Sequence, residues 1–203
     1  MSTIRRILIE FAHPAIRRSR VNRRLVEAVR DLADVTVHDL YEAYPEFDID
    51  VQREQALLAS HDVVVLQHPL YWYSTPAILK EWQDLVLQHG WAYGRDGRAL
   101  RGKLMMSAIT AGGGEESYRR SGSNHFTIGE LLAPIEQTAA LCGMRYMPPF
   151  IVYGTHDLGV SQIEVVAREY RRTIEAIRDG EREPPLVADS SRPAADPGAR
   201  TGG

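Results

Sequence analysis

The sequence has almost no cysteine and no long hydrophobic segment. One cysteine, Cys142, occurs in 203 residues, which excludes an internal disulfide and an all-cysteine metal site and suits a reducing cytoplasm. No apolar run approaches the roughly 20 residues that cross a bilayer. Glu10 interrupts the first apolar run and no small-residue cleavage site follows, so no signal peptide is expected. A net charge of −3 gives no case for a nucleic-acid partner.

Common catalytic signatures are also missing. The chain contains no HExxH, CxxC, Walker A or GxSxG pattern, and no GxGxxG follows the first apolar strand pattern. The spacing of four histidines does not match a metal-ligand motif, so no metal is expected and each is interpreted as structural or surface: His68, His89, His125 and His156. Cys142 is interpreted as a small buried residue.

Strand and helix patterns alternate along the chain. Strands are expected at 7–12, 35–38, 63–66, 103–109 and 146–153. Five strands alternating with five helices predict a parallel sheet covered on both faces. Without GxGxxG, the flavodoxin-like three-layer α/β sandwich with five strands in the order 2-1-3-4-5 is favoured over a dinucleotide-binding fold. We expect one such domain at residues 1–182. Residues 183–203 are rich in proline, glycine and alanine and predict a disordered tail.

Prolines and capping pairs set the expected helix boundaries. One helix should begin at Pro76, capped by Ser74 or Thr75. Thr127 and Glu130 have the spacing of a capping box. They should begin a single turn at 128–132, followed by a main helix from Pro134 to about Cys142, because proline disrupts a helix interior. The spacing of Ser161 and Glu164 predicts a capping box for the last helix. Residues 40–50 and the proline-containing strand at 146–153 have irregular patterns.

The most informative stretch is residues 62–94. A buried-strand pattern at Val63–Leu66 is followed by a loop that begins at His68-Pro69 and carries three aromatic rings, Tyr71, Trp72 and Tyr73. Rings can be ordinary core, but three in a proline-led loop at the carboxyl edge of a sheet favour a platform for a ligand.

Two further loops should meet the first at this edge. The loop after the first strand carries polar and basic residues at a helix start, a combination that can bind phosphate: His13, Arg17, Arg18, Ser19, Arg20 and Asn22. The alternative interpretation is that the arginines lie on a solvent-exposed face and bind no ligand. We prefer this interpretation for Arg23 and Arg24. The loop at 110–114, TAGGG, lets the backbone approach a ligand, although a glycine run alone is commonest in a plain turn. Together the three loops favour a planar, phosphate-bearing cofactor, and flavin mononucleotide (FMN) fits best.

Four separated motifs also resemble one family. They are FAHP at 11–14 with Ser19 and Asn22, QHPLYWYSTPAILKEWQDLVLQHGWAYG at 67–94, GKLMMSAITAGGGEESY at 102–118 and ELLAPIEQTAALCGM at 130–144. The chain resembles the flavodoxin-like NAD(P)H:quinone oxidoreductases, most of all the ancillary proteins of glutathione-regulated potassium-efflux systems. This resemblance implies a homodimer that binds FMN, with FAD as an alternative, near the subunit interface, and uses NADPH or NADH as hydride donor.

The resemblance also implies roles for residues. The phosphate and ribityl chain would contact His13, Ser19, Arg20, Val21 and Asn22. The flavin ring would be bordered by Pro69, Leu70, Tyr71, Trp72 and Tyr73, and its pyrimidine edge by Thr110, Ala111, Gly112 and Gly113. At position 111 this sequence has alanine where the family has threonine. This difference should matter little if the flavin is contacted there by the backbone. Tyr118 and His125 would assist hydride transfer.

We therefore expect a cytoplasmic enzyme that transfers two electrons from NAD(P)H through flavin to a quinone. Two alternatives remain. One is a flavin-binding regulatory subunit of a membrane potassium-efflux transporter, located at the inner face of the membrane; this role is compatible with catalysis. The other is a one-electron flavodoxin carrier, ranked last because such proteins are usually far more acidic and lack the HPLYWYS loop.

Overall fold

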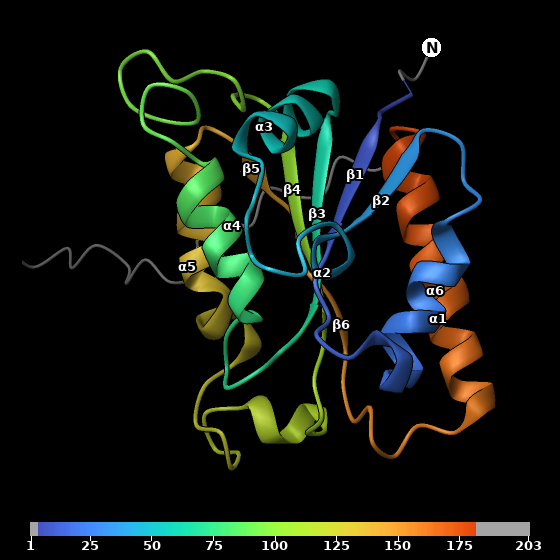
Figure 1. Cartoon of the computed structure of the whole chain (residues 1–203). Helices are drawn as coiled ribbons and strands as arrows, with labels where there is room; N and C mark the ends of the chain where they lie inside the picture. Colours follow the sequence, from blue (N-terminus) through green and yellow to red (C-terminus); the bar gives the residue numbers. More distant parts are fainter. Residues whose placement is uncertain (1–3, 182–203) are drawn as a thin grey trace, which may run out of the picture.

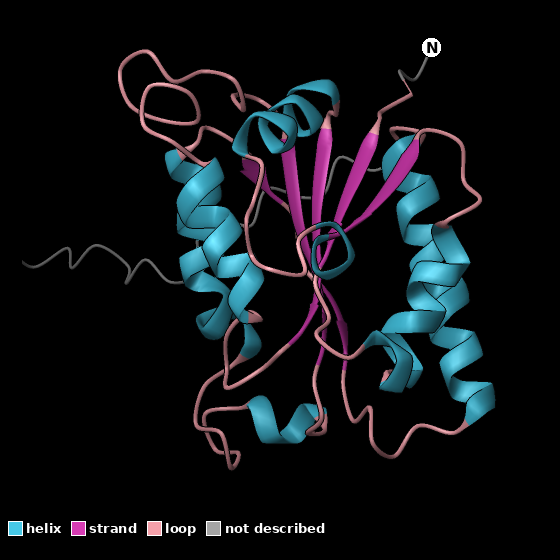
Figure 2. Cartoon of the chain, viewed as in Figure 1, coloured by secondary structure: helices cyan, strands magenta, loops and turns pink. Residues whose placement is uncertain are grey.

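The computed structural model describes residues 4–181, which form a parallel sheet between two layers of helices (Figures 1 and 2). The six strands are β1 (Ile7–Phe11), β2 (Val35–Asp39), β3 (Val63–Pro69), β4 (Leu104–Thr110), β5 (Arg145–Tyr146) and β6 (Phe150–Val152). Their order is β2-β1-β3-β4-β5, and β6 also pairs with β4. The predicted flavodoxin-like architecture is confirmed. The predicted tail at 183–203 lies outside the described residues.

The helices divide between the two faces of the sheet. Helices α1 (Arg20–Val29) and α6 (Val160–Arg178) lie side by side on one face. The other face is covered by α3 (Val51–Ser60), α4 (Ala77–Val86) and α5 (Ile128–Leu141), with the short α2 (Leu40–Ala43) beside them. Two 3₁₀ turns, η1 (Ile16–Arg18) and η2 (Glu115–Tyr118), follow β1 and β4. Within residues 4–181, no helix is long and apolar enough to cross a membrane.

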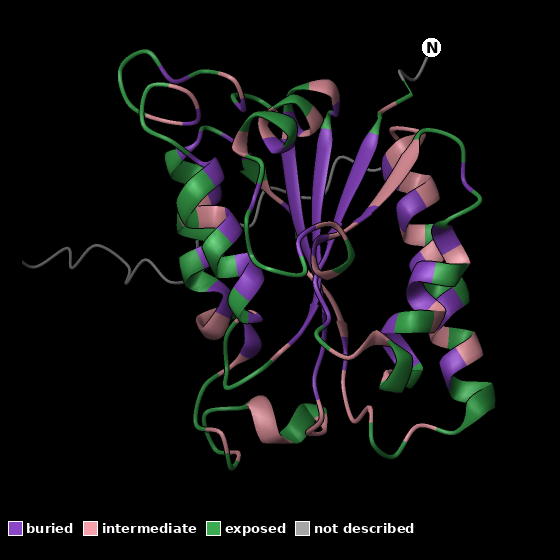
Figure 3. Cartoon of the chain, viewed as in Figure 1, coloured by how far each residue is buried: buried purple, intermediate pink, exposed green. Residues whose placement is uncertain are grey.

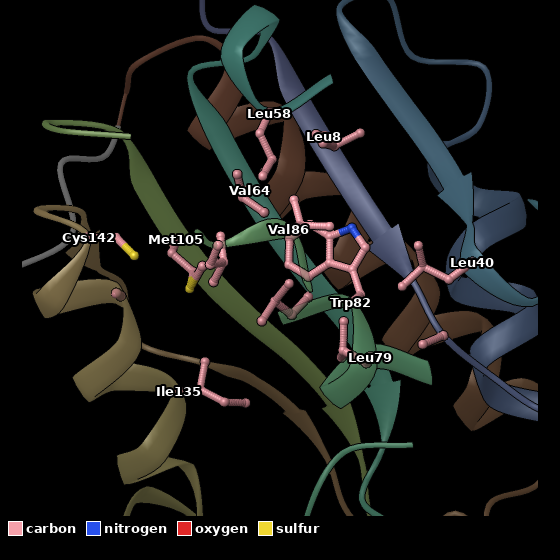
Figure 4. Packing of buried hydrophobic residues seen from close by; sticks show 14 of the residues in the cluster. Leu8, Leu40, Leu58, Val64, Leu79, Trp82, Val86, Met105, Ile135 and Cys142 are labelled. Carbon is pink, nitrogen blue, oxygen red and sulfur yellow. The ribbon is translucent and has the colours of Figure 1, made fainter. Parts of the chain in front are cut away.

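Strands β1, β3 and β4 are buried along their whole length (Figure 3). Because side chains alternate across a strand, each strand contributes to two cores. Leu8, Val64 and Met105 pack with Trp82 and Ile135 of α4 and α5 (Figure 4). On the opposite face, residues such as Ile9, Val65 and Met106 pack against α1 and α6.

The predicted fifth strand is wrong as a single element, because the chain forms two short strands there and the sheet therefore has six. Met105 pairs with Tyr146 and Ala108 with Phe150, so four steps along this segment match three along β4. Pro148 and Pro149 lie in the interval, and neither has an N–H group to donate to the ladder. Strand β3, in contrast, continues through His68 to Pro69, beyond its expected end at Leu66.

Two predicted helix starts need correction. Pro76 is the N-cap of α4, with no side-chain cap from Ser74 or Thr75. Helix α6 is capped at Gly159, whose N–H donates to the Gln162 side chain at 2.8 Å. Glu164 instead accepts two hydrogen bonds from the Arg24 guanidinium, at 2.9 and 2.6 Å, so Arg24 is not simply solvated.

Helix α5 is continuous from Ile128 to Leu141, although Pro134 lies inside it. Thr127 and Glu130 form the expected capping box, which satisfies the first N–H groups of the helix. Pro134 is exposed, and the buried stripe runs past it on the opposite face as Ile128, Leu132, Ile135 and Ala139. The free energy gained by burying the whole stripe is larger than the loss of the single backbone hydrogen bond that the proline removes.

Candidate functional site

One cavity of about 780 Å³ lies at the carboxyl edge of the sheet, the lower edge in Figure 1. The segments that follow β1, β3, β4 and β6 all contribute to its lining. The structure brings together every predicted cofactor residue except Ala111: His13, Ser19, Arg20, Val21, Asn22, Pro69, Leu70, Tyr71, Trp72, Tyr73, Thr110, Gly112 and Gly113. Ala111 is buried behind them, with its N–H bound to the carbonyl of Val152 at 2.8 Å.

The first loop presents the N-terminus of α1 to this cavity. Ser19 is the N-cap, and its Oγ accepts the N–H of Asn22 at 3.1 Å. The positive end of the helix dipole and the adjacent Arg18 and Arg20 make this part of the cavity suited to an anion. Arg17 does not line the cavity.

His13 adds a neutral ring to this part of the cavity, which is suited to an anion. Burial lowers the pKa of His13 below its usual value. Nδ1 accepts the N–H of Ala15 at 3.0 Å, so the proton of the neutral ring is on Nε2, which is left as a donor.

Asn22 connects the first loop to the end of β4. Its side chain is buried and donates through Nδ2 to the hydroxyl of Thr110 at 2.7 Å, whereas its Oδ1 has no partner within the described part of the chain. Gln67 donates to the Asn22 carbonyl at 3.4 Å and accepts from the Tyr170 hydroxyl at 3.0 Å. This polar chain fixes the start of α1 against the sheet.

The aromatic loop forms a tight, strained turn. Tyr71 and Ser74 exchange backbone hydrogen bonds of 3.0 and 2.9 Å across Trp72 and Tyr73, whose φ angles are 48° and 63°. Two consecutive non-glycine residues in the left-handed region cost about 1–3 kcal/mol each, and such strain concentrates at binding sites. The Trp72 side chain is 93% exposed, and Tyr71 and Tyr73 are also exposed, so these rings are not core.

The glycines of the third loop make room for protein side chains. A Cβ on Gly112 would lie 2.7 Å from Nε2 of His156, and one on Gly113 would lie 3.3 Å from the ring of Tyr118. The sequence suggested that these glycines let the backbone approach a ligand; in the structure they first allow two side chains to pack into the cavity wall.

Only one of the two predicted catalytic residues lines the cavity. The ring of Tyr118 packs at 5.8 Å from that of Tyr153, and burial, with a smaller contribution from Tyr73, raises its pKa, so its hydroxyl remains a hydrogen-bond donor at neutral pH. His125 is exposed, has a φ of 60° and does not line the cavity.

Sequence reasoning missed several cavity residues: Ala15, Ser117, Ser123, Asn124, Thr155 and His156. The sequence pattern predicts only a structural or surface position for His156. Its signal was position, because it follows the last strand and the carboxyl ends of all parallel strands meet at one edge. Asn124 accepts a hydrogen bond from the Tyr73 hydroxyl at 3.2 Å, which joins two loops far apart in sequence.

The chain shares this fold with known proteins over most of its length. A family model described as flavodoxin-like fold matches residues 5–177. One relative, the glutathione-regulated potassium-efflux system ancillary protein KefG of Pectobacterium carotovorum, is 48% identical over 84% of this chain and 93% of its own length. Another, the uncharacterized NAD(P)H oxidoreductase YrkL of Bacillus subtilis, is 45% identical over 77% of this chain and 90% of its own.

Two solved structures are also similar. General stress protein 14 of Treponema denticola, in complex with FMN, is 40% identical with a TM-score of 0.82, covering 85% of this chain and 99% of that one. An NADPH-quinone reductase from P. pentosaceus is 32% identical with a TM-score of 0.76, covering 83% and 96%.

Proposed function

This chain belongs to the family of proteins with the flavodoxin-like fold, and on that premise we propose that it is an FMN-dependent NAD(P)H:quinone oxidoreductase. The observation that carries the proposal is the cavity, in which a capped helix N-terminus and an exposed aromatic turn lie side by side. The FMN complex of one neighbour and the oxidoreductase names of others support this assignment.

The residues present fit this cofactor. Ser19, Arg20 and the N–H groups at the start of α1 would hold the phosphate. Tyr71 and Trp72 would flank the ring system, and the backbone around Gly112 would meet its polar edge. The bound flavin supplies the hydride chemistry, accepting two electrons from a nicotinamide and passing them to a quinone.

Tyr118 is proposed as the residue that assists the transfer. It remains protonated because burial raises its pKa, so it can donate a hydrogen bond to negative charge that develops during reduction. His125, given the corresponding role by resemblance, is not proposed for it because its side chain is exposed outside the cavity.

The experiment is direct. The purified protein should be yellow, with about one flavin per chain, and should oxidise NADPH or NADH faster when menadione is present. A colourless protein that cannot be reconstituted with FMN or FAD would contradict the proposal.

A second role, compatible with the first, is proposed from the similarity to KefG: docking on a potassium-efflux transporter at the cytoplasmic face of a membrane. Co-purification with such a transporter, independent of NAD(P)H, tests it.

A homodimer is also proposed. Trp72 beside the cavity and Phe126 are large exposed rings that a second copy could cover. Light scattering of wild type and Trp72→Ser tests this assembly.

A further inference from the structure

Three ionisable side chains meet inside the core, and none of them lines the cavity. Glu10 lies on β1, opposite His38 of β2 in the parallel register, and Glu54 projects from α3. All three are buried, and both glutamates are fully inaccessible. Figure 4 shows the apolar surroundings of this layer, with Leu8, Leu40 and Trp82 between the sheet and the helices.

Glu54 is held in a fixed orientation. Its Oε1 is 2.8 Å from Nε2 of His38 and accepts the Tyr44 hydroxyl at 2.5 Å, and its Oε2 accepts the Trp82 indole N–H at 2.9 Å. Donors that orient a carboxylate in this way are typical of the groups that surround metal ligands.

Glu10 is not satisfied. Among residues 4–181, neither of its carboxyl oxygens has a hydrogen-bond partner, although its side chain is fully buried. Burying a carboxylate without a partner is strongly unfavourable, and a second carboxylate beside it increases the cost. The cluster therefore needs a positive species between Glu10 and Glu54, which can be a proton or a cation.

The geometry and chemistry match a cation. One ligand atom from each of Glu10, His38 and Glu54 lies within 4.8 Å of the others. Ligands of a single metal ion at about 2.1 Å lie roughly 3.0–4.2 Å apart, depending on coordination geometry. Binding would therefore replace the 2.8 Å hydrogen bond between His38 Nε2 and Glu54 Oε1 and bring the outermost of the three ligand atoms slightly closer together. Two carboxylates balance one divalent charge, and an imidazole ligand favours zinc and its transition-metal neighbours over magnesium or calcium.

We propose that Glu10, His38 and Glu54 bind one divalent transition-metal cation of the zinc class. The ion ties β1, β2 and α3 together inside the core, and Tyr44 and Trp82 hold the Glu54 ligand in place. Because these three residues lie outside the cavity, flavin content and metal content are independent measurements.

The test uses the full chain without an affinity tag, stripped with a chelator and then dialysed against Zn²⁺. Metal is counted by mass spectrometry, and Co²⁺ is used as a visible-absorption probe of the coordination. We compare wild type with Glu10→Leu and with Glu10→Gln, which keeps the side-chain volume if the leucine variant does not fold. Glu136→Gln is the control, because this glutamate is exposed on α5.

We expect one Zn²⁺ per chain in wild type and in Glu136→Gln, and none in either Glu10 variant. With free Zn²⁺ at 100 times its Kd, the wild-type Tm should rise by about 5–10 °C, and this shift should vanish in the Glu10 variants. Equal zinc binding in wild type and Glu10→Gln would overturn the proposal, as would an unchanged wild-type Tm. Either result would mean that a proton on Glu10 neutralises the cluster.

Discussion

Replacing Ser19 with aspartate should weaken FMN binding without weakening the fold. Ser19 caps α1, and aspartate, asparagine and serine are about equally good N-caps, so the unfolding free energy should hardly change. The new carboxylate would face the cofactor phosphate, which carries a charge of about −1.5 to −2. Two unit charges about 4 Å apart repel by roughly 1 kcal/mol in water and about 4 kcal/mol near a protein surface.

Ser19 is half-buried, so the repulsion lies between these two values and the value in water is a minimum. With the phosphate charge, the penalty is at least about 2 kcal/mol, which is roughly a 30-fold rise in Kd. Ser19→Asn is the matched control, because it has the size and capping ability of aspartate without the charge. Kd is measured by quenching of FMN fluorescence on titration with apoprotein. The ratio of the two Kd values should shrink in 1 M salt, where the screening length is about 3 Å. Equal affinities of the aspartate and asparagine variants at low salt would show that the phosphate binds elsewhere.

Three further changes test other parts of the molecule. Tyr118→Phe should slow flavin reduction by NAD(P)H about tenfold in stopped flow with unchanged flavin content, because only a donor used during the reaction is lost. Burial lowers the pKa of His68 to about 4, so the unfolded state binds a proton more tightly than the folded state does. The contribution of His68 to the unfolding free energy is therefore fully present above pH 6.5. The unfolding free energy should fall by about 2 kcal/mol between pH 7 and pH 5. Urea unfolding of His68→Gln should show little of this loss, and an equal loss would contradict the assignment. Asn22→Ala removes the 2.7 Å bond to Thr110 and should lower the unfolding free energy by about 1–3 kcal/mol, whereas an unchanged urea midpoint would show that this bond is not needed.

The sequence predicted the parts of this molecule that depend on local pattern. Unbroken apolar runs such as Val63–Leu66 and the Thr127–Glu130 capping pair have a direct physical meaning, and both correspond to elements of the structure. The continuous helix through Pro134 was missed because burial on its far face outweighs one lost hydrogen bond, and a local rule does not weigh the two.

Residues brought together by the fold were harder to predict. Glu10 lies inside an apolar strand, and its partners His38 and Glu54 are distant in sequence, so only the register of β1 with β2 and the packing of α3 reveal the cluster. His156 reaches the cavity because Gly112 leaves space for its ring. Neither arrangement follows from spacing along the chain.

The chain of hydrogen bonds from Tyr170 through Gln67 and Asn22 to Thr110 has a consequence for local unfolding. It joins α6, which covers the same face of the sheet as α1, to two walls of the cavity. An opening that detaches α6 therefore breaks the support of Asn22 and should lower affinity for a ligand in the cavity. A bound ligand must then oppose that opening by the same free energy. Amide hydrogens of α6 around Tyr170 should exchange more slowly with solvent when the cavity is filled, although α6 itself does not line it.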